Sequence, residues 1–181
     1  KGIYEAAQAR PECAGMGTTL VSLVFCGNRV SIGHIGDSRC YRLRGDKFEQ
    51  LTRDHSLLQE QIDGGQLTVE QARFSLNKNL VTRALGIEAI VPADIVEYRA
   101  EADDIYLLNS DGLTDMVEPA VVQSIIVKSR ANLAAAAKEL VDVANQNGGR
   151  DNISVVLVRV PKAFLPSAAW AQRYLAKKRA G

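Results

Sequence analysis

The sequence has few of the features that identify secreted, membrane-spanning or nucleic-acid-binding proteins. It has 3 cysteines in 181 residues and no CxxC pair, which excludes a disulfide framework and a cysteine zinc site. We expect no signal peptide, and the sequence has no apolar run near the roughly 20 residues that cross a bilayer. Its formal net charge is only +1, so no global field attracts nucleic acid or anionic lipid. We therefore expect a cytoplasmic protein without a membrane span or a nucleic-acid partner.

What remains is an ordinary globular composition with 46% hydrophobic and 24% charged residues. The length suits one domain over residues 1–161, followed by a basic tail over 162–181. That tail is either a short amphipathic helix or a frayed linker. The chain begins at Lys1, not Met, and a helical pattern over residues 3–9 starts almost at once. We therefore expect a fragment whose N-terminal part is missing.

The first third of the chain predicts two β-hairpins. Apolar and β-branched residues fill the four expected strands, and Gly27-Asn28 and Gly45-Asp46 supply the two turns. The expected strands cover residues 18–26, 29–35, 40–43 and 48–51. We interpret this part as an antiparallel meander, with Cys26 in the core.

The remainder groups helices and strands instead of alternating them. Residues 54–86 read as an insertion of short helices and a candidate lid, with a capping-box spacing at Thr68 and Gln71. Strands over 94–100 and 105–110, read as a third hairpin, precede helices over 119–129 and 131–146. The near-continuous apolar stretch 153–160 is expected to be a central strand. This grouping favours an α+β fold with antiparallel sheets.

Three aspartates stand where expected strands begin or end. Asp37 follows strand 29–35, Asp111 follows strand 105–110, and Asp151 precedes strand 153–160. If the last two strands are antiparallel neighbours, the end of one lies beside the start of the other. That pairing would bring Asp111 and Asp151 to one sheet edge, which Asp37 joins if its strand ends there too.

Carboxylates gathered in this way would repel one another, and divalent cations would relieve the repulsion. Oxygen ligands without histidine or cysteine select Mg²⁺ or Mn²⁺ over zinc. Two such ions can activate a water and hold a phosphoryl group. Any single Asp-Gly or Gly-Asp pair is more simply explained as a turn, so the functional interpretation depends on the three occurring together.

Five motifs in fixed order resemble the metal-dependent protein serine/threonine phosphatases of type 2C, in their bacterial branch. The similarity extends over about residues 1 to 160. The motifs are Gly15-Met16-Gly17-Thr18-Thr19, Ile35-Gly36-Asp37-Ser38-Arg39, Leu51-Thr52-Arg53-Asp54-His55-Ser56, Ser110-Asp111-Gly112-Leu113-Thr114-Asp115 and Gly149-Arg150-Asp151-Asn152-Ile153-Ser154.

The resemblance implies two packed antiparallel β-sheets flanked by helices, an α-β-β-α sandwich. It implies hydrolysis of phosphoserine and phosphothreonine in proteins by a metal-activated water, in signalling beside a cognate kinase. By the same resemblance, Asp111 and Asp151 are ligands of a binuclear Mg²⁺ or Mn²⁺ centre. Asp37 and Asp111 would hold a third ion, and residues 55–86 would form a flap.

The chain also departs from the family pattern. The family's first strands carry a phosphate-binding arginine, an acidic ligand and an aspartate that bridges the two metals, and this sequence has no counterpart of them. The resemblance therefore leaves the catalytic residues unknown and predicts a fold without its N-terminal strands, poorly active alone. Unpaired edges would favour dimerisation or strand exchange. A non-catalytic, phosphoprotein-binding domain of the same fold and a simple cation-binding module remain open alternatives.

Overall fold

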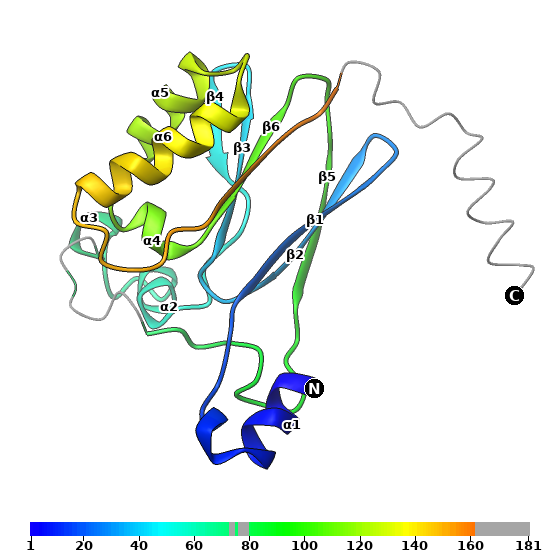
Figure 1. Ribbon diagram of the computed structural model, residues 1–181, viewed down its shortest axis with the longest axis vertical. Coiled ribbons are helices and arrows are strands. Elements are labelled where there is room, and N and C mark those ends of the chain that lie inside the picture. The colour runs from blue at the N-terminus through cyan, green and yellow to red at the C-terminus, as the bar shows by residue number, and fades with distance from the viewer. Residues whose placement is uncertain (73–74, 76–79, 162–181) are drawn as a thin grey trace, which may run out of the picture.

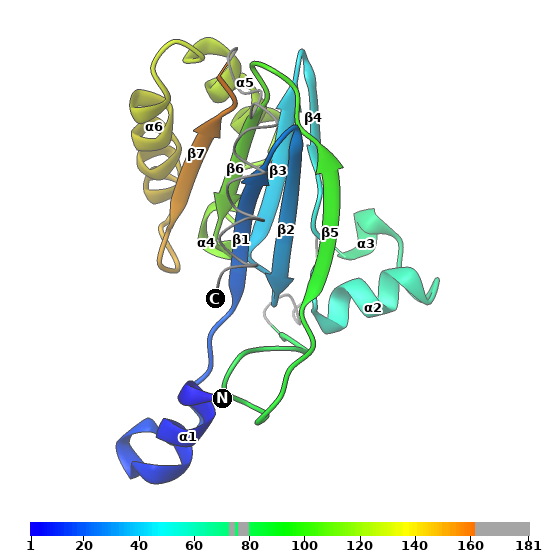
Figure 2. The same ribbon diagram turned by 90° about the vertical axis from the view of Figure 1, so that its right-hand side faces the viewer.

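Two antiparallel β-sheets pack face to face in the computed structural model, which describes residues 1–72, 75 and 80–161 (Figures 1 and 2). The three-stranded sheet has the order β1-β2-β5 and the four-stranded sheet the order β4-β3-β6-β7. The strands are β1 (Leu20–Cys26), β2 (Arg29–Ile35), β3 (Arg39–Arg44), β4 (Lys47–Gln50), β5 (Asp94–Arg99), β6 (Ile105–Asn109) and β7 (Val155–Arg159). This arrangement confirms the predicted fold class.

Helices flank the two sheets, and the two longest cover the outer face of the four-stranded sheet (Figure 1). The helices are α1 (Gly2–Ala9), the 3-10 turn η1 (Pro11–Cys13), α2 (Leu57–Asp63), α3 (Val69–Ala72), α4 (Asp111–Thr114), α5 (Pro119–Lys128) and α6 (Leu133–Gln146). Helix α1 lies beyond the end of β1 (Figure 2). Among the described residues, every helix is too short or too polar to span a bilayer.

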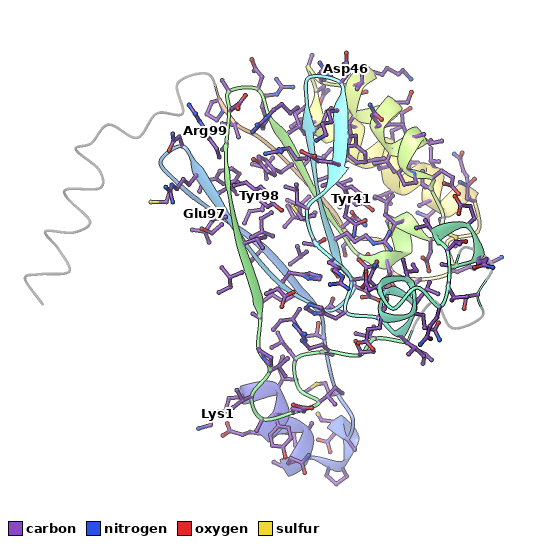
Figure 3. The ribbon with its side chains drawn as sticks, turned by 180° about the vertical axis from the view of Figure 1, so that it is seen from behind. Lys1, Tyr41, Asp46, Glu97, Tyr98 and Arg99 are labelled. Atoms are coloured by element: carbon purple, nitrogen blue, oxygen red, sulfur yellow. The ribbon has the colours of Figure 1, made fainter. Side chains whose placement is uncertain are left out.

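Strand β6 divides the core because successive side chains point to opposite faces. Leu107 packs under the helices with Leu140 and Ile126, whereas Tyr106 points between the sheets. There its ring meets Phe25 edge-on, with centroids 5.5 Å apart. On β5, Tyr98 likewise joins the layer between the sheets, whereas the flanking Glu97 lies on the opposite face of the strand (Figure 3). Both apolar layers are therefore fixed by strand alternation.

Several local predictions are confirmed. Helix α2 begins after Ser56, whose side chain accepts a hydrogen bond from the Gln59 amide. The predicted capping box forms, since Thr68 and Gln71 exchange side-chain-to-backbone hydrogen bonds. Helix α6 forms within the predicted range 131–146 and buries its apolar face against β7 and α5. The short-range signals therefore located the helices well.

The two predicted hairpins form, as β1–β2 and β3–β4. The predicted meander is wrong, because the first hairpin belongs to the three-stranded sheet and the second to the four-stranded sheet. Strand β2 pairs with β5 and strand β3 pairs with β6. The predicted hairpin over 94–110 is wrong for the same reason. Between β2 and β3, Gly36 has φ +104 and redirects the chain. Tight two-residue turns identify local pairs, but longer connections leave the choice of partner to the tertiary structure.

Two further expectations are corrected. Strand β7 was expected at the centre of a sheet, but within the described residues it is an edge strand that pairs only with β6. Cys26 was expected in the core, but it is exposed. It shares the outer face of the three-stranded sheet with Val24, because both occupy alternate positions in β1. The apolar residues next to Cys26 in the sequence thus did not show which face of β1 is buried.

Candidate metal-binding site

Asp111 and Asp151 are brought together by the antiparallel pairing of β6 and β7, as predicted. Asp111 is separated from the end of β6 by one residue and opens α4, a short helix that the sequence pattern did not predict. Its Oδ1 accepts a hydrogen bond from the Gly112 amide at 2.9 Å. Asp151 lies in the loop before β7, and its Oδ1 accepts from the Asn152 amide at 2.6 Å. The two carboxylates therefore belong to adjacent segments.

Ser110 fastens these two segments to each other. Its Oγ donates to the carbonyl of Asn152 at 2.9 Å and accepts from the amide of Ser154 at 3.0 Å. Gly112 allows the close approach, because a Cβ at that position would lie only 2.5 Å from the Asn152 carbonyl oxygen. Ser110 and Gly112 are thus needed for the contact between the two segments, and not only for the turn in which they lie.

Asp37 belongs to the same electrostatic neighbourhood. Burial and then the nearby Asp111 carboxylate raise the pKa of Asp37 to about 6. Burial first, and then Asp151 and Asp115 among others, raise the pKa of Asp111. The carboxylates of Asp37, Asp111 and Asp151 therefore repel one another, although their segments are far apart in the sequence.

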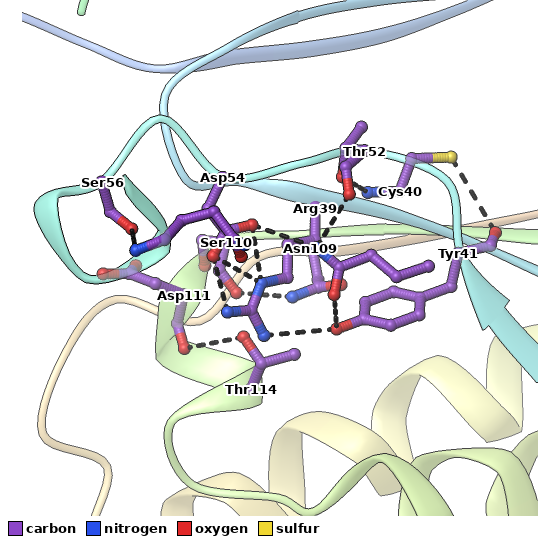
Figure 4. Close-up of polar contacts among 12 residues, drawn as sticks. Arg39, Cys40, Tyr41, Thr52, Asp54, Ser56, Asn109, Ser110, Asp111 and Thr114 are labelled. Atoms are coloured by element: carbon purple, nitrogen blue, oxygen red, sulfur yellow. Dashed lines mark hydrogen bonds and ion pairs between the residues drawn. The ribbon is translucent and has the colours of Figure 1, made fainter. Parts of the chain in front are cut away.

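An arginine that the sequence interpretation overlooked anchors the residues just after Asp37. Arg39 donates to both carboxylate oxygens of Asp54 through Nε at 3.0 and 2.9 Å, and through Nη2 at 2.6 Å (Figure 4). Its Nη1 donates to the Tyr41 hydroxyl at 3.3 Å. Asp54 is buried, and Gln50 donates to its Oδ1 at 3.1 Å. An arginine inside an apolar strand was the signal that could have identified this pair.

The three aspartates fit a divalent cation only as part of a ligand set. In favour of a cation, two of the carboxylates carry raised pKa values, and within the described residues none of the three has an ion-pair partner. However, the described part of the chain has no group of three His, Cys, Asp or Glu side chains that could hold a metal ion by itself. Further ligands are needed to complete such a site.

Two packed antiparallel sheets with Asp37, Asp111 and Asp151 near one another are the features of a metal-dependent phosphatase fold, and comparison with known proteins agrees. Residues 3–153 match the Protein phosphatase 2C family, and the chain belongs to that family. The chain is 41% identical over 158 residues to the serine/threonine phosphatase stp of Listeria innocua, which is 87% of this chain and 62% of that protein. It therefore spans less than two thirds of the length of this relative.

Solved structures agree with this assignment. The crystal structure of the Mycobacterium tuberculosis serine/threonine phosphatase PstP/Ppp aligns with a TM-score of 0.83 and 37% identity, covering 88% of this chain and 67% of that one. A second structure is the catalytic domain of PstP in complex with 2 manganese ions. It aligns with a TM-score of 0.79 and 36% identity, covering 88% of this chain and 66% of that one. The shared fold thus extends over nearly all described residues.

Proposed function

We propose that the protein containing this chain is a bacterial, metal-dependent serine/threonine phosphatase that hydrolyses phosphoserine and phosphothreonine in proteins. The observation that carries the proposal is the convergence of Asp37, Asp111 and Asp151 from three segments in a chain of the Protein phosphatase 2C family. The relative with two manganese ions supports Mg²⁺ or Mn²⁺ as the cofactor. Oxygen-only ligands are the donor set that these ions prefer.

In this proposal the three aspartates would hold the metal ions, with Asp111 between Asp37 and Asp151. Bound divalent ions would supply a nucleophilic water and charge stabilisation for the phosphoryl group. The chain's own contribution is to fix the carboxylates in place. Ser110 and Gly112 hold the Asp111 and Asp151 segments in contact, and the Arg39–Asp54 pair anchors the strand after Asp37.

The proposal is tested on the longer protein that contains this chain. We expect Mn²⁺-stimulated hydrolysis of a phosphothreonine peptide, which falls at least about 100-fold in Asp111→Asn and Asp151→Asn, because each loses a charged metal ligand. The matched control is Asp142→Asn on the exposed face of α6, which should retain activity. Unchanged turnover in both ligand variants would overturn the proposal.

The regulatory alternative is favoured by one observation, the absence of a complete three-ligand group within the described residues. A phosphoprotein-binding domain of this fold would bind a phosphopeptide without releasing phosphate. Measuring phosphopeptide binding and phosphate release on the same sample separates the two functions. Binding without release, in the longer protein and with Mn²⁺ present, would favour the regulatory domain.

The partners and organisation follow from the same proposal. We propose phosphoproteins and a cognate serine/threonine kinase as partners, and a cytoplasmic setting in which Cys13, Cys26 and Cys40 stay reduced, as free thiols suggest.

Residues 1–161 would form one domain with a flap over 55–86. The basic tail 162–181 lies outside the described residues. Self-association is proposed through exposed apolar residues on the three-stranded sheet, among them Val24 and Ile95.

A further inference from the structure

The segment before α2 runs beside the turn that carries Asp37. The His55 amide donates to the Gly36 carbonyl at 2.8 Å, and the Leu51 amide donates to the Cys40 carbonyl at 2.7 Å. Between them, the Cys40 amide donates to Thr52 Oγ1 at 3.0 Å. Residues 36–40 are therefore lined on one side by residues 51–55, and side chains of that segment can control the turn.

The imidazole of His55 makes a contact on each side of its ring. Its Nδ1 accepts a hydrogen bond from the Gly36 amide at 3.0 Å, so Nδ1 carries no proton. Nε2 lies 3.1 Å from Asp94 Oδ2 and also 3.1 Å from Arg83 Nη1. In the neutral ring the proton is then on Nε2, which donates to Asp94, while the Arg83 guanidinium lies beside the same nitrogen. Arg83 donates to the other oxygen of Asp94 at 2.7 Å. One buried ring thus connects the Gly36 amide to Arg83 near the end of the proposed flap and to Asp94, which follows it.

The Gly36 amide is a sensitive point in the turn. Gly36 has φ +104, and a Cβ there would lie 2.3 Å from the Thr19 side chain, so only glycine fits this position of the turn. Thr19 Oγ1 and Ser38 Oγ are 2.8 Å apart across the same turn. On its other side His55 is backed by the buried ring of His34, with centroids 4.7 Å apart. The ring therefore cannot shift without disturbing the peptide that precedes Asp37.

We propose that His55 is a positioning residue that fixes the Gly36–Asp37 turn and couples it to Arg83, near the end of the flap segment, and to Asp94 at the start of β5. The proposal depends on the proposed function only in taking Asp37 as a metal ligand. Through this ring, displacement of Arg83 or Asp94 loosens the Gly36 amide, and with it the placement of the Asp37 carboxylate. The described contacts of the His55 ring are with Gly36, Asp94, Arg83 and His34.

Two substitutions at His55 separate its two contacts. Asn places a polar atom near the position of Nδ1, whereas Gln places one near the position of Nε2. In the 181-residue chain, amide hydrogen exchange measured by NMR should be accelerated at least tenfold at Gly36 in His55→Gln. It should change less than threefold in His55→Asn, because the acceptor for the Gly36 amide is restored. The Tyr106 amide in β6 reports global opening and should be unchanged in both. Equal exchange at Gly36 in the two variants would overturn the proposal.

The coupling to the flap segment is tested with His55 left intact. Asp94→Asn removes the charge that accepts from Nε2 and should accelerate exchange at Gly36 about threefold, while Tyr106 stays protected. No change at Gly36 would overturn the coupling, even if a His55 variant failed to fold. In the longer protein that contains this chain, Mn²⁺-induced broadening of the Asp37 amide signal supplies a second readout, with its midpoint raised at least fivefold in His55→Gln and unchanged in His55→Asn. Because exchange is measured without turnover, failure of the phosphatase proposal would leave this result interpretable.

Discussion

At the scale of the residue, the three aspartates show a conflict between folding and function. Burial raises the pKa of Asp37 and of Asp111, and the proximity of further carboxylates adds to both shifts. A raised carboxyl pKa means that the ionised group is less stable in the folded chain than in the unfolded one. The site therefore lowers the stability of the metal-free protein at neutral pH.

Replacing Asp37 by Asn should accordingly stabilise the chain in the presence of a chelator. The folded pKa of Asp37 is about 6 against an ordinary value of 3.8. The destabilisation by Asp37 is therefore absent below pH 3.8, develops as the pH rises to about 6, and is complete at pH 7. After allowance for solvent screening we expect a gain of about 1 to 2 kcal/mol at pH 7 and none near pH 3.5.

Urea unfolding of wild type and Asp37→Asn at the two pH values measures this difference. Asp142→Asn on the surface of α6 is the control and should show little difference at either pH. Mn²⁺ should stabilise the wild type more than the Asp37 variant, because the cation relieves the repulsion that the substitution removes. A destabilised Asp37→Asn at pH 7 without metal would contradict the electrostatic argument.

Asp104 is a buried carboxylate, and both of its oxygens accept hydrogen bonds. It is 1% exposed, accepts from Arg44 Nε at 2.8 Å and from Arg44 Nη2 at 2.7 Å, and accepts from the Glu101 amide at 2.8 Å. We expect Asp104→Asn to destabilise the chain by about 2 to 3 kcal/mol, because the amide cannot replace the bidentate charged contact. Glu101→Gln removes the exposed partner of the same arginine and should cost less than about 0.5 kcal/mol. Comparable losses in the two variants, measured by urea unfolding, would be inconsistent with this reasoning.

At the scale of the element, α4 is the structure that joins the proposed ligands. It has only four residues, yet it starts at Asp111 and rests on the loop that carries Asp151. No amphipathic pattern can be read from so short a helix. Its position is set by the Ser110 contacts and by the backbone-to-backbone approach at Gly112.

Gly112→Ala tests this contact directly. The added methyl group would lie 2.5 Å from the Asn152 carbonyl oxygen and 3.0 Å from its carbon, so the two backbones must separate. We expect a loss of about 1 to 3 kcal/mol in thermal or urea unfolding and weaker Mn²⁺ binding. Gly2→Ala is the matched control, since its Cβ would meet nothing within 4 Å, and it should not weaken Mn²⁺ binding. Wild-type stability in Gly112→Ala would show that the loop moves freely away from α4.

At the scale of the whole molecule, the two sheets are covered unequally. Helices α5 and α6 bury one face of the four-stranded sheet (Figures 1 and 2). The outer face of the three-stranded sheet leaves Val24 61% and Ile95 75% exposed, on the same side of the sheet. Exposed apolar surface of this kind favours association with another surface.

We therefore expect the 181-residue chain to self-associate as its concentration rises. Sedimentation velocity should show a growing dimer or larger species, and the double substitution of Val24 and Ile95 by Lys should reduce it. Val121→Lys on α5 is the control, because Val121 is also exposed but lies on the helical face. Association that persists unchanged in the double variant would place the contact elsewhere, such as at the edge of β7.

The sequence by itself predicted most of the elements, singled out the three aspartates as candidates and identified the family. The apolar and β-branched strands, the turn at Gly27-Asn28 and the capping box at Thr68 and Gln71 are local properties, and each appears where it was predicted. Motifs that keep their order along the chain likewise need no structure to be recognised, as the match over residues 3–153 confirms.

Only the tertiary structure decided which strands pair across long connections, and therefore how the site is held. The sheet to which β2 or β3 belongs, the edge position of β7 and the Arg39–Asp54 pair depend on contacts between residues distant in sequence. The same holds for the ring of His55 between Gly36 and Asp94. Local propensity carries no information about such contacts, because their free energy arises only when the complete chain buries its surface and pairs its charges.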